Sequence, residues 1–331
     1  MIRRIDRRET ITLLGGAAAW PLAARAERVE MPVIGLLQIG APSSWDFAGF
    51  RQGLKDTGYV EGQNLAVEYQ WANDDPDLLP QLAADLVRRR VRVIVAFGSA
   101  LAVRAAKTAT DTIPIVFGYG GDPVQQDLVA SLNRPGGNVT GMTSLAGELV
   151  GKQLGMLHEL LPQASHFGFL SDPKVQAHES LVKDAQTAAS AIGGTIEVLT
   201  ASTSGEIDAV FARIANGKRV QGLMVTPMPF FLAAPARVQL AILAARYVVP
   251  AIYTTREAVE AGGLLSYGSN ITDRDREVGH YVGRILKGEK PADLPVQQQS
   301  KFELVINLLT AKAIGLTIPN SLRSLADKVI E

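Results

Sequence analysis

Short apolar runs of strand length alternate with amphipathic helical patterns along almost the whole chain, and this alternation restricts the possible folds more than any other feature of the sequence. The first apolar run covers residues 33–39, a helical pattern follows over 47–57, and two further runs lie at 91–97 and 113–117. Uninterrupted apolar runs are typical of parallel strands that helices cover on both faces. We therefore expect an α/β fold with doubly wound, mostly parallel sheets.

The series of strands and helices begins again after residue 144. A helix is expected over 149–161, and strands are expected at 167–170, 195–200 and 222–225. Two successive series predict two doubly wound, Rossmann-like lobes. No long flexible linker separates them, and short connections between lobes favour a hinge. The predicted division gives residues 27–144 with about 268–298 to one lobe, and residues 145–267 with about 299–331 to the other.

Residues 1–26 have the layout of a secretory signal peptide. A basic start that contains the pair Arg7-Arg8 is followed by an apolar stretch over 11–19 and by Ala-Arg-Ala at 24–26. The apolar stretch is about half the roughly 20 residues that a membrane-spanning helix needs. We expect export to the periplasm, and the alternative is an amphipathic N-terminal helix of a cytosolic protein.

Signal cleavage is expected between Ala26 and Glu27. The arginine pair points to the twin-arginine route, but Thr10 stands where that route usually has a bulky apolar residue, so the general secretory route stays open. No later stretch of the sequence reaches 18 apolar residues, and no cysteine is present for a lipid anchor.

The composition excludes several classes of protein. Basic and acidic side chains are equal in number, 33 of each, so the basic excess typical of nucleic-acid-binding proteins is missing and no nucleic-acid partner is expected. The absence of cysteine excludes disulfides, thiolate zinc sites, iron–sulfur clusters and thiol catalysis. With only 4 histidines as well, we expect neither a metal site nor a cofactor.

Sequence motifs of catalysis are missing too. No G-x-G-x-x-G follows a predicted strand and no G-x-S-x-G is present, while GELVGK at 147–152 has neither the spacing nor the Ser or Thr of a P-loop. His158-Glu159 and His178-Glu179 lack the second histidine of a zinc protease. We therefore expect a protein that is not an enzyme.

Candidate ligand-binding residues lie where the predicted strands end, because ligands of open α/β sheets bind outside the carboxyl ends of the strands. The candidates are small, hydroxyl-bearing, aromatic or acidic residues at these ends: Ser43, Trp45, Gly98, Ser99, Tyr119, Asp122, Pro123, Pro227, Tyr253, Ser266 and Tyr267.

Two of these candidates have a purely structural alternative. Ser99 precedes a predicted helix, whose free N–H groups could hold a carboxylate, but Ser99 could also serve only as the N-cap. Asp122 precedes an expected short helix over 124–132 and could bind a ligand ammonium, cap that helix, or do both. Aromatic residues at the strand ends could form the wall of an apolar ligand site or belong to the core.

Several segments together resemble the tryptophan/tyrosine-type group of ABC transporter substrate-binding proteins. They are VIGLLQIG, RQGLKDTGYVEGQNLAVEYQWA, VRVIVAFGS, IPIVFGYGGDPV, SLNRPGGNVTGMTS and the tail that begins GLLSYGSNITDRD. The resemblance covers nearly the whole chain after the predicted signal peptide. It implies a type I periplasmic-binding-protein-like fold, whose two lobes close on a small molecule and deliver it to an ABC permease in the inner membrane.

The resemblance also implies roles for particular residues. It places Gly98, Ser99, Asp122 and Pro123 in the cleft of the first lobe, and Ser266-Tyr267 at the facing strand end. The turn Pro-Gly-Gly-Asn within RPGGNVTG is expected to shape the entry to the hinge, because paired glycines permit unusual backbone angles.

The predicted function is therefore a monomeric receptor for a small organic solute. The predicted ligand is an amino acid or an aromatic or apolar carboxylate. The apolar, proline-rich stretch TPMPFF at 226–231 stands where an amino-acid binder is expected to have a polar pair, so it argues against an amino acid and favours aromatic acids or other apolar anions. The alternatives are an exported α/β hydrolase or lyase, and a ligand-sensing module for a membrane regulator.

Overall fold

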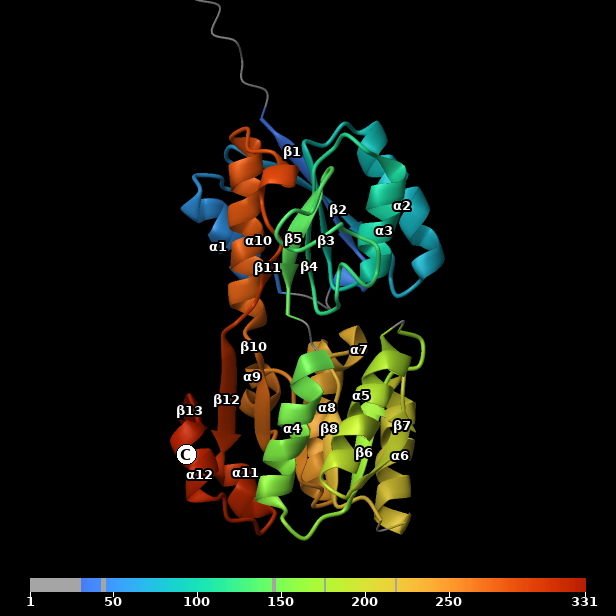
Figure 1. Cartoon of the computed structure of the whole chain (residues 1–331), viewed down its shortest axis with the longest axis vertical. Helices are drawn as coiled ribbons and strands as arrows, with labels where there is room; N and C mark the ends of the chain where they lie inside the picture. Colours follow the sequence, from blue (N-terminus) through green and yellow to red (C-terminus); the bar gives the residue numbers. More distant parts are fainter. Residues whose placement is uncertain (1–30, 43–45, 145–146, 176, 218) are drawn as a thin grey trace, which may run out of the picture. The chain divides into compact units, whose positions relative to one another are not determined.

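Two separate sheets, each covered by helices on both faces, organise the chain (Figure 1). Every helix and strand among the described residues belongs to the unit formed by Pro32–Glu331. The computed structural model describes residues 31–42, 46–144, 147–175, 177–217 and 219–331. The predicted signal peptide and two predicted site residues, Ser43 and Trp45, lie outside the described residues.

The first sheet has six strands in the order β11-β5-β4-β3-β1-β2, and every neighbouring pair is parallel. Its strands are β1 (Val33–Gln38), β2 (Ala66–Trp71), β3 (Val93–Phe97), β4 (Ile115–Tyr119), β5 (Val139–Thr143) and β11 (Gln297–Gln298). The helices that cover it are α1 (Ala48–Asp56), α2 (Leu79–Arg88), α3 (Ala100–Ala109) and α10 (Ile271–Leu286). This sheet and these helices are called the first lobe below.

The second sheet has seven strands in the order β13-β12-β10-β9-β8-β6-β7, and only the β10–β12 pair is antiparallel. Its strands are β6 (His166–Ser171), β7 (Thr195–Thr200), β8 (Gly222–Val225), β9 (Ala251–Tyr253), β10 (Leu265–Ser269), β12 (Phe302–Asn307) and β13 (Lys328–Ile330). The helices around it are α4 (Gly147–Leu160), α5 (His178–Ala191), α6 (Ser204–Gly217), α7 (Pro229–Leu232), α8 (Ala234–Arg246), α9 (Arg256–Glu260), α11 (Leu308–Ala313) and α12 (Asn320–Leu325). This group is called the second lobe. The predicted α/β fold with two doubly wound, mostly parallel sheets is confirmed.

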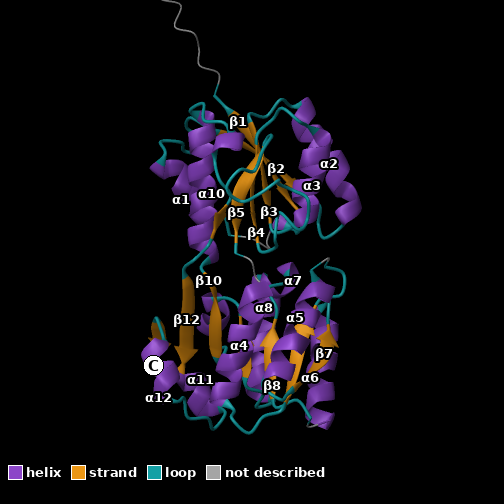
Figure 2. Ribbon diagram, in the orientation of Figure 1, coloured by secondary structure: helices purple, strands orange, loops and turns teal. Residues whose placement is uncertain are grey.

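The first sheet lies between α1 and α10 on one face and α2 and α3 on the other (Figure 2). Successive residues of β1 therefore enter different cores, with Ile34 and Leu36 beside α1 and α10 and Leu37 beside α2 and α3. All three side chains are fully buried. Burial on both faces explains why this strand has no polar alternation in the sequence.

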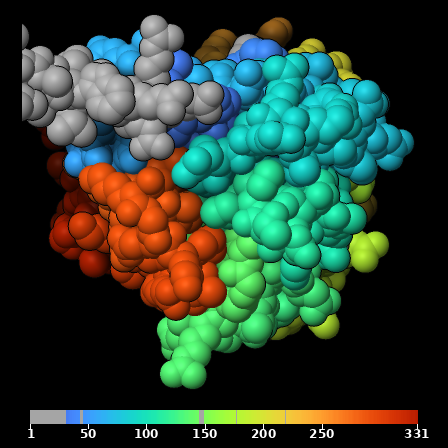
Figure 3. Space-filling view, turned by 90° about the horizontal axis from the view of Figure 1, so that it is seen from above, coloured from blue at the N-terminus to red at the C-terminus, as the bar shows by residue number. Residues whose placement is uncertain are grey.

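The chain passes between the lobes after β5, after β10 and after β11. The second passage sends α10 back to the first lobe, where it packs against α1, more than two hundred residues earlier in the sequence (Figure 3). Among the described helices, none has both the length and the apolar character that crossing a membrane requires.

Glycines allow α1 and α10 to approach with their backbones in contact. A methyl group added at Gly53 would overlap the carbonyl oxygen of Arg276, and one added at Gly279 would overlap that of Phe50. Since both obstacles are backbone atoms, they cannot move aside as a flexible side chain would. The interhelix contact therefore depends on the absence of side chains at these positions.

The structure corrects the prediction of a short helix over 124–132, which is a series of turns instead. Asp127 has a positive φ of 56°, which a continuing α-helix does not allow. Arg104 and Lys107 of α3 donate hydrogen bonds to the carbonyl oxygens of Gln126 and Asp127, at 2.9 and 2.8 Å. These side chains satisfy carbonyl groups that helical N–H groups would otherwise reach.

The sequence analysis did not predict four short elements. They are the helices α7 and α9, and α12 and β13 near the end of the chain. Each has between three and six residues, so hydrophobic periodicity has too few positions in which to appear.

We expect Gly53→Ala to lower the free energy of unfolding by about 1–3 kcal/mol, because the methyl group overpacks the α1–α10 contact. Gly155→Ala is the matched control, since Gly155 is exposed on α4 with no atom near its missing side chain, and it should raise stability by up to about 1 kcal/mol. Urea unfolding, monitored by circular dichroism, measures the free energy of unfolding of both variants. Equal effects of the two substitutions would contradict the packing argument.

Acid should weaken the same helix contact through Asp56. Its carboxylate contacts His280 at 3.0 Å and accepts hydrogen bonds from Gln52 and Arg276 at 2.7 Å each, and these interactions hold the pKa of Asp56 well below its usual range. A lowered folded-state pKa gives stability that is complete above the unfolded value of roughly 3.9 and is lost as the pH falls toward the folded value. As the pH is lowered from 5 to 2, the urea midpoint of unfolding should fall less steeply for Asp56→Asn than for the unchanged protein. If the two midpoints fall in parallel with pH, Asp56 does not stabilise the helix contact in this way.

Candidate functional site

A cavity with an empty volume of about 750 Å³, counting the part open to solvent, is lined by residues of both lobes. Several of its lining residues lie directly after strands: Gly98 follows β3, Gly120 follows β4, Thr226 follows β8 and Thr254 follows β9. Parallel strands present their carboxyl ends at one edge of a sheet, which is why distant segments meet here. The cavity is the candidate ligand site.

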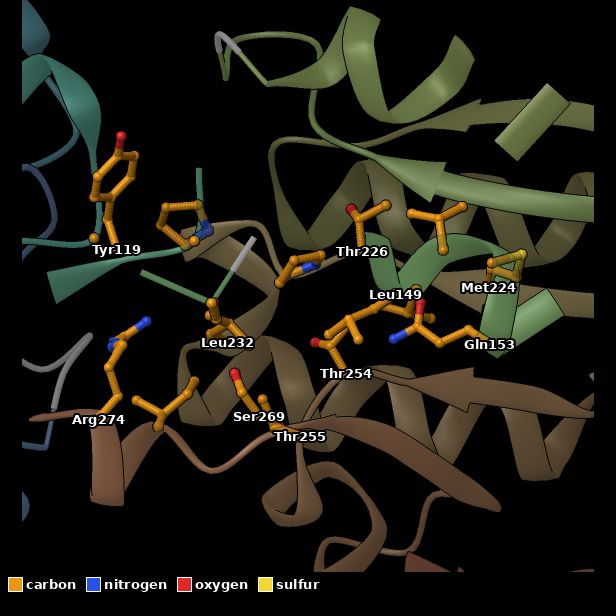
Figure 4. A pocket seen from close by; sticks show the side chains of 18 of the residues that line it. Tyr119, Leu149, Gln153, Met224, Thr226, Leu232, Thr254, Thr255, Ser269 and Arg274 are labelled. Atoms are coloured by element: carbon orange, nitrogen blue, oxygen red, sulfur yellow. The ribbon is translucent and has the colours of Figure 1, made fainter. Parts of the chain in front are cut away.

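The part of the cavity inside the second lobe is apolar. Phe169 of β6 and Met224 of β8 line it together with Leu149 and Val150 of α4. Met224 lies on the opposite side of the cavity from Tyr119 and Arg274 (Figure 4). An apolar group of a ligand would gain free energy by displacing water from these side chains.

Gln153 and Thr226 add neutral polar groups to this region and are themselves held in place. The buried Gln153 donates a hydrogen bond from Nε2 to the carbonyl oxygen of Tyr267, at 2.7 Å, and so joins α4 to β10. The hydroxyl of Thr226 donates to the carbonyl oxygen of Leu170, at 2.8 Å. Their partners fix where these side chains stand before any ligand arrives.

The charged part of the cavity comes from α10. Arg274 lines the cavity although only 5% of the residue is exposed, and its Nε and Nη2 atoms donate to Oδ1 of Asp275, at 3.0 and 2.9 Å. Asp275 is 1% exposed and does not line the cavity. Arg274 and Asp275 therefore form a buried ion pair beside the cavity.

The structure places two predicted site residues in capping positions rather than on the cavity wall. Ser99 is the N-cap of α3, and its Oγ accepts a hydrogen bond from the N–H of Leu101 at 3.0 Å. Oδ1 of Asp122 accepts from the N–H groups of Val124 and Gln125, at 2.8 and 3.1 Å. Pro123, next to Asp122, is also absent from the lining.

Tyr119, Tyr253 and Ser266 are buried, and each has a side-chain oxygen without a hydrogen-bond partner. Tyr119 lines the cavity, and its ring packs edge-on against Phe117 with centroids 5.3 Å apart. Burial raises the pKa of both tyrosine hydroxyls well above the usual value, so both stay protonated. Tyr253 and Ser266 do not line the cavity.

The cavity thus brings together Gly98, Tyr119 and Pro227 from the predicted residues. Tyr267 contributes its carbonyl oxygen to Gln153 while its ring packs 6.0 Å from that of Phe302, and it does not line the cavity.

Sequence reasoning missed Gln153 and Arg274, which are inside helices, and the strand-end rule cannot select such residues. It did indicate the strand end that carries Thr254, but the neighbouring Tyr253 was chosen there.

Two doubly wound lobes with a shared cavity at their strand ends define a bilobal solute-binding protein. The sequence model of the family described as "ABC transporter substrate binding protein" matches residues 39–330, so the chain belongs to this family. The family consists of substrate-binding proteins rather than enzymes, in agreement with the prediction that this chain is not an enzyme. Among the described residues, no group of three or more His, Cys, Asp or Glu side chains could hold a metal ion.

Similar proteins agree with this assignment. The chain is 28% identical over 296 residues to a tyrosine-binding protein of Clostridioides difficile, and the match covers 86% of this chain and 81% of the relative. A conserved domain protein of Vibrio cholerae has a TM-score of 0.79 at 28% identity. An ABC domain of Streptococcus pneumoniae in complex with L-Trp has a TM-score of 0.78 at 26% identity. Each structural match covers 90% of this chain and 99% of the other, and the predicted type I periplasmic-binding-protein-like fold is confirmed.

We expect Tyr119→Phe to leave the stability of the ligand-free protein within about 0.5 kcal/mol or to raise it, because the hydroxyl that it removes is buried without a partner. Tyr281→Phe is the matched control: Tyr281 is equally buried, but its hydroxyl donates to the carbonyl oxygen of Pro295 at 2.8 Å, so the change should cost about 1 kcal/mol. Urea unfolding compares the two variants, and a larger loss for Tyr119→Phe would show that its hydroxyl has a stabilising partner.

Proposed function

We propose that this protein is the periplasmic receptor of an ABC importer and delivers a small organic solute to a permease in the inner membrane. The ligand is an amino acid or an aromatic or apolar carboxylate, and the protein acts as a monomer. The observation that carries the proposal is a cavity whose wall is completed by both lobes. A ligand that contacts both lobes stabilises their closed arrangement and so shifts the population toward it.

The passages between the lobes support a hinge. Gln299, on the third passage, donates its backbone N–H to the carbonyl oxygen of Thr143 at 2.8 Å and its side-chain Nε2 to that of Asn270 at 2.7 Å. Thr143 ends β5 before the first passage, and Asn270 forms the second. Gln299 therefore links all three passages between the lobes by hydrogen bonds. Such a linked connection favours rotation of the lobes about a single hinge axis.

Residues 1–26 support export, because their pattern is that of a signal peptide. The experiments below also distinguish two alternative functions. A sensing module for a membrane regulator would bind its ligand in the same way but dock on a different partner. An exported enzyme would return the ligand chemically changed.

Thermal unfolding of the chain from Glu27 onward, against amino acids, aromatic acids, sugars and polyamines, tests binding. A ligand that binds only the folded state, and that is present at about 100 times its Kd, adds about 2.7 kcal/mol to the free energy of unfolding. It therefore raises the Tm by a few degrees. Small-angle scattering should show compaction with the same ligand, and the ligand should be recovered unchanged. No shift with any class, or an altered ligand, would refute the receptor function.

We expect Leu232→Trp to weaken binding of the ligand found in this way by at least about tenfold, because a larger side chain at this half-buried position fills part of the cavity. Ile242→Trp is the control, since Ile242 is 58% exposed on α8 and does not line the cavity, and its affinity should equal that of the unchanged protein. Calorimetric titration measures both. Equal affinities of the two variants would place the ligand elsewhere.

A further inference from the structure

Two polar side chains, Gln153 and Thr226, lie in the apolar part of the cavity inside the second lobe. They are 5% and 4% exposed, and Leu149, Phe169 and Met224 line the same part. A polar atom in such surroundings needs a hydrogen bond from water or from a ligand. The hydrogen bonds that these two side chains can still make therefore restrict the ligand group that binds here.

The hydroxyl of Thr226 already donates its only proton. Its Oγ1 donates to the carbonyl oxygen of Leu170 at 2.8 Å, and a carbonyl oxygen cannot donate in return. The backbone N–H of Thr226 donates to the same carbonyl oxygen, at 3.1 Å. For a ligand, the side chain of Thr226 therefore offers only the lone pairs of Oγ1, which accept hydrogen bonds.

The amide of Gln153 has one possible orientation, because only its nitrogen can donate to the carbonyl oxygen of Tyr267 at 2.7 Å. Its Oε1 is not fully enclosed and has no hydrogen-bond partner among the described residues. Gln153 lies on the same side of the cavity as Met224, with its amide end directed toward the middle of the cavity (Figure 4). Oε1 is therefore free to accept a hydrogen bond from a ligand.

Acceptors outnumber donors among the described side chains of this apolar part. Oγ1 of Thr226 and Oε1 of Gln153 accept, and the second N–H of the Gln153 amide is the one donor that remains. The nearby lining hydroxyls of Thr254 and Thr255 rotate to donate or to accept, so they favour neither kind of ligand group. A ligand group that donates a hydrogen bond matches this arrangement best.

A buried acceptor discriminates because it penalises a ligand that does not satisfy it. A tail with no donor would displace water from Oε1 of Gln153 and leave that oxygen without any hydrogen bond, which is costly in an apolar pocket. A pocket that contains such a group rejects an analogue of the same shape that lacks the donor. The contact with Tyr267 fixes the amide in advance, so Oε1 cannot turn away at no cost.

We propose that Gln153 and Thr226 make this part of the cavity selective for a ligand whose apolar tail carries an O–H or N–H donor, as in a phenol, an indole or an alcohol. Oε1 of Gln153 is the principal acceptor, and Oγ1 of Thr226 is the second. This inference rests on the proposed receptor function, because it concerns the ligand of the same site.

Pairs of ligands of similar shape test the proposal by calorimetric titration of the chain from Glu27 onward. The pairs are L-tyrosine with 4-fluoro-L-phenylalanine, 3-(4-hydroxyphenyl)propionate with 3-(4-fluorophenyl)propionate, and L-tryptophan with 3-(3-benzothienyl)-L-alanine. The second compound of each pair has fluorine or sulfur in place of the donor. In the pair that binds best, the compound with the donor should bind at least about tenfold more tightly.

The outcomes separate this inference from the receptor function itself. Equal affinities within the pair that binds best overturn the donor selectivity and leave a receptor. A sugar, a polyamine or an acid without a donor on its tail that binds while every pair fails has the same consequence. If no compound of any class binds, both proposals fail.

Variants of the two acceptors test their role within one protein. Gln153→Met keeps the length of the side chain and removes Oε1. Thr226→Val keeps the shape and removes Oγ1, while the carbonyl oxygen of Leu170 keeps its backbone partner. Each variant should reduce the preference for the compound with the donor at least about threefold, and should leave or raise the affinity for its partner compound.

Gln239→Met is the matched control. Gln239 is half-buried on α8, donates its Nε2 to Ser204 and Asp208, and does not line the cavity, so the preference should equal that of the unchanged protein. Circular dichroism confirms folding, and if one acceptor variant does not fold, the other decides. A purely structural role would weaken both compounds of a pair alike, so a loss of affinity with an unchanged preference contradicts the proposal.

Discussion

The close packing of α10 on α1 is the contact on which the rest of the arrangement depends. Glycines at 53 and 279 let the two backbones touch, and Asp56 adds hydrogen bonds to α10 at the edge of the contact. Because α10 follows β10 of the second lobe, this contact obliges the chain to return to the first lobe and then to leave it again. The multiple connection, and the position of Arg274 at the cavity, are both consequences.

The cavity is built for holding a molecule rather than for transforming one. Its neutral polar groups, such as Gln153 and Thr226, already have backbone partners that fix their orientation. Its one described charge, on Arg274, is compensated by a buried carboxylate. General acid–base catalysis requires a group that exchanges protons near neutral pH within reach of the reacting atoms, and neither a guanidinium nor a buried tyrosine hydroxyl with a raised pKa does so.

Local capping explains why some predicted site residues lie outside the cavity. Ser99 and Asp122 are at strand ends, as the rule for ligand sites requires, but their oxygens accept hydrogen bonds from the N–H groups of the following turn. The sequence could not decide between capping and ligand contact, because both need the same residue types at the same positions. Gly98, which has no side chain and a φ of 76°, remains at the wall.

The sequence by itself determined the two series of parallel strands, and the strands at 195–200 and 222–225 begin and end where the sequence analysis placed them. Such strands are encoded by runs of neighbouring residues, so local pattern is enough. Only the tertiary structure decided that Gln153 and Arg274 reach the cavity. In the sequence each is one polar residue of an amphipathic helix, and its position depends on how that helix packs against segments more than a hundred residues away. Contacts between segments closer in the sequence decided 124–132, where α3 supplies hydrogen-bond donors to the carbonyl groups and turns form in place of a helix.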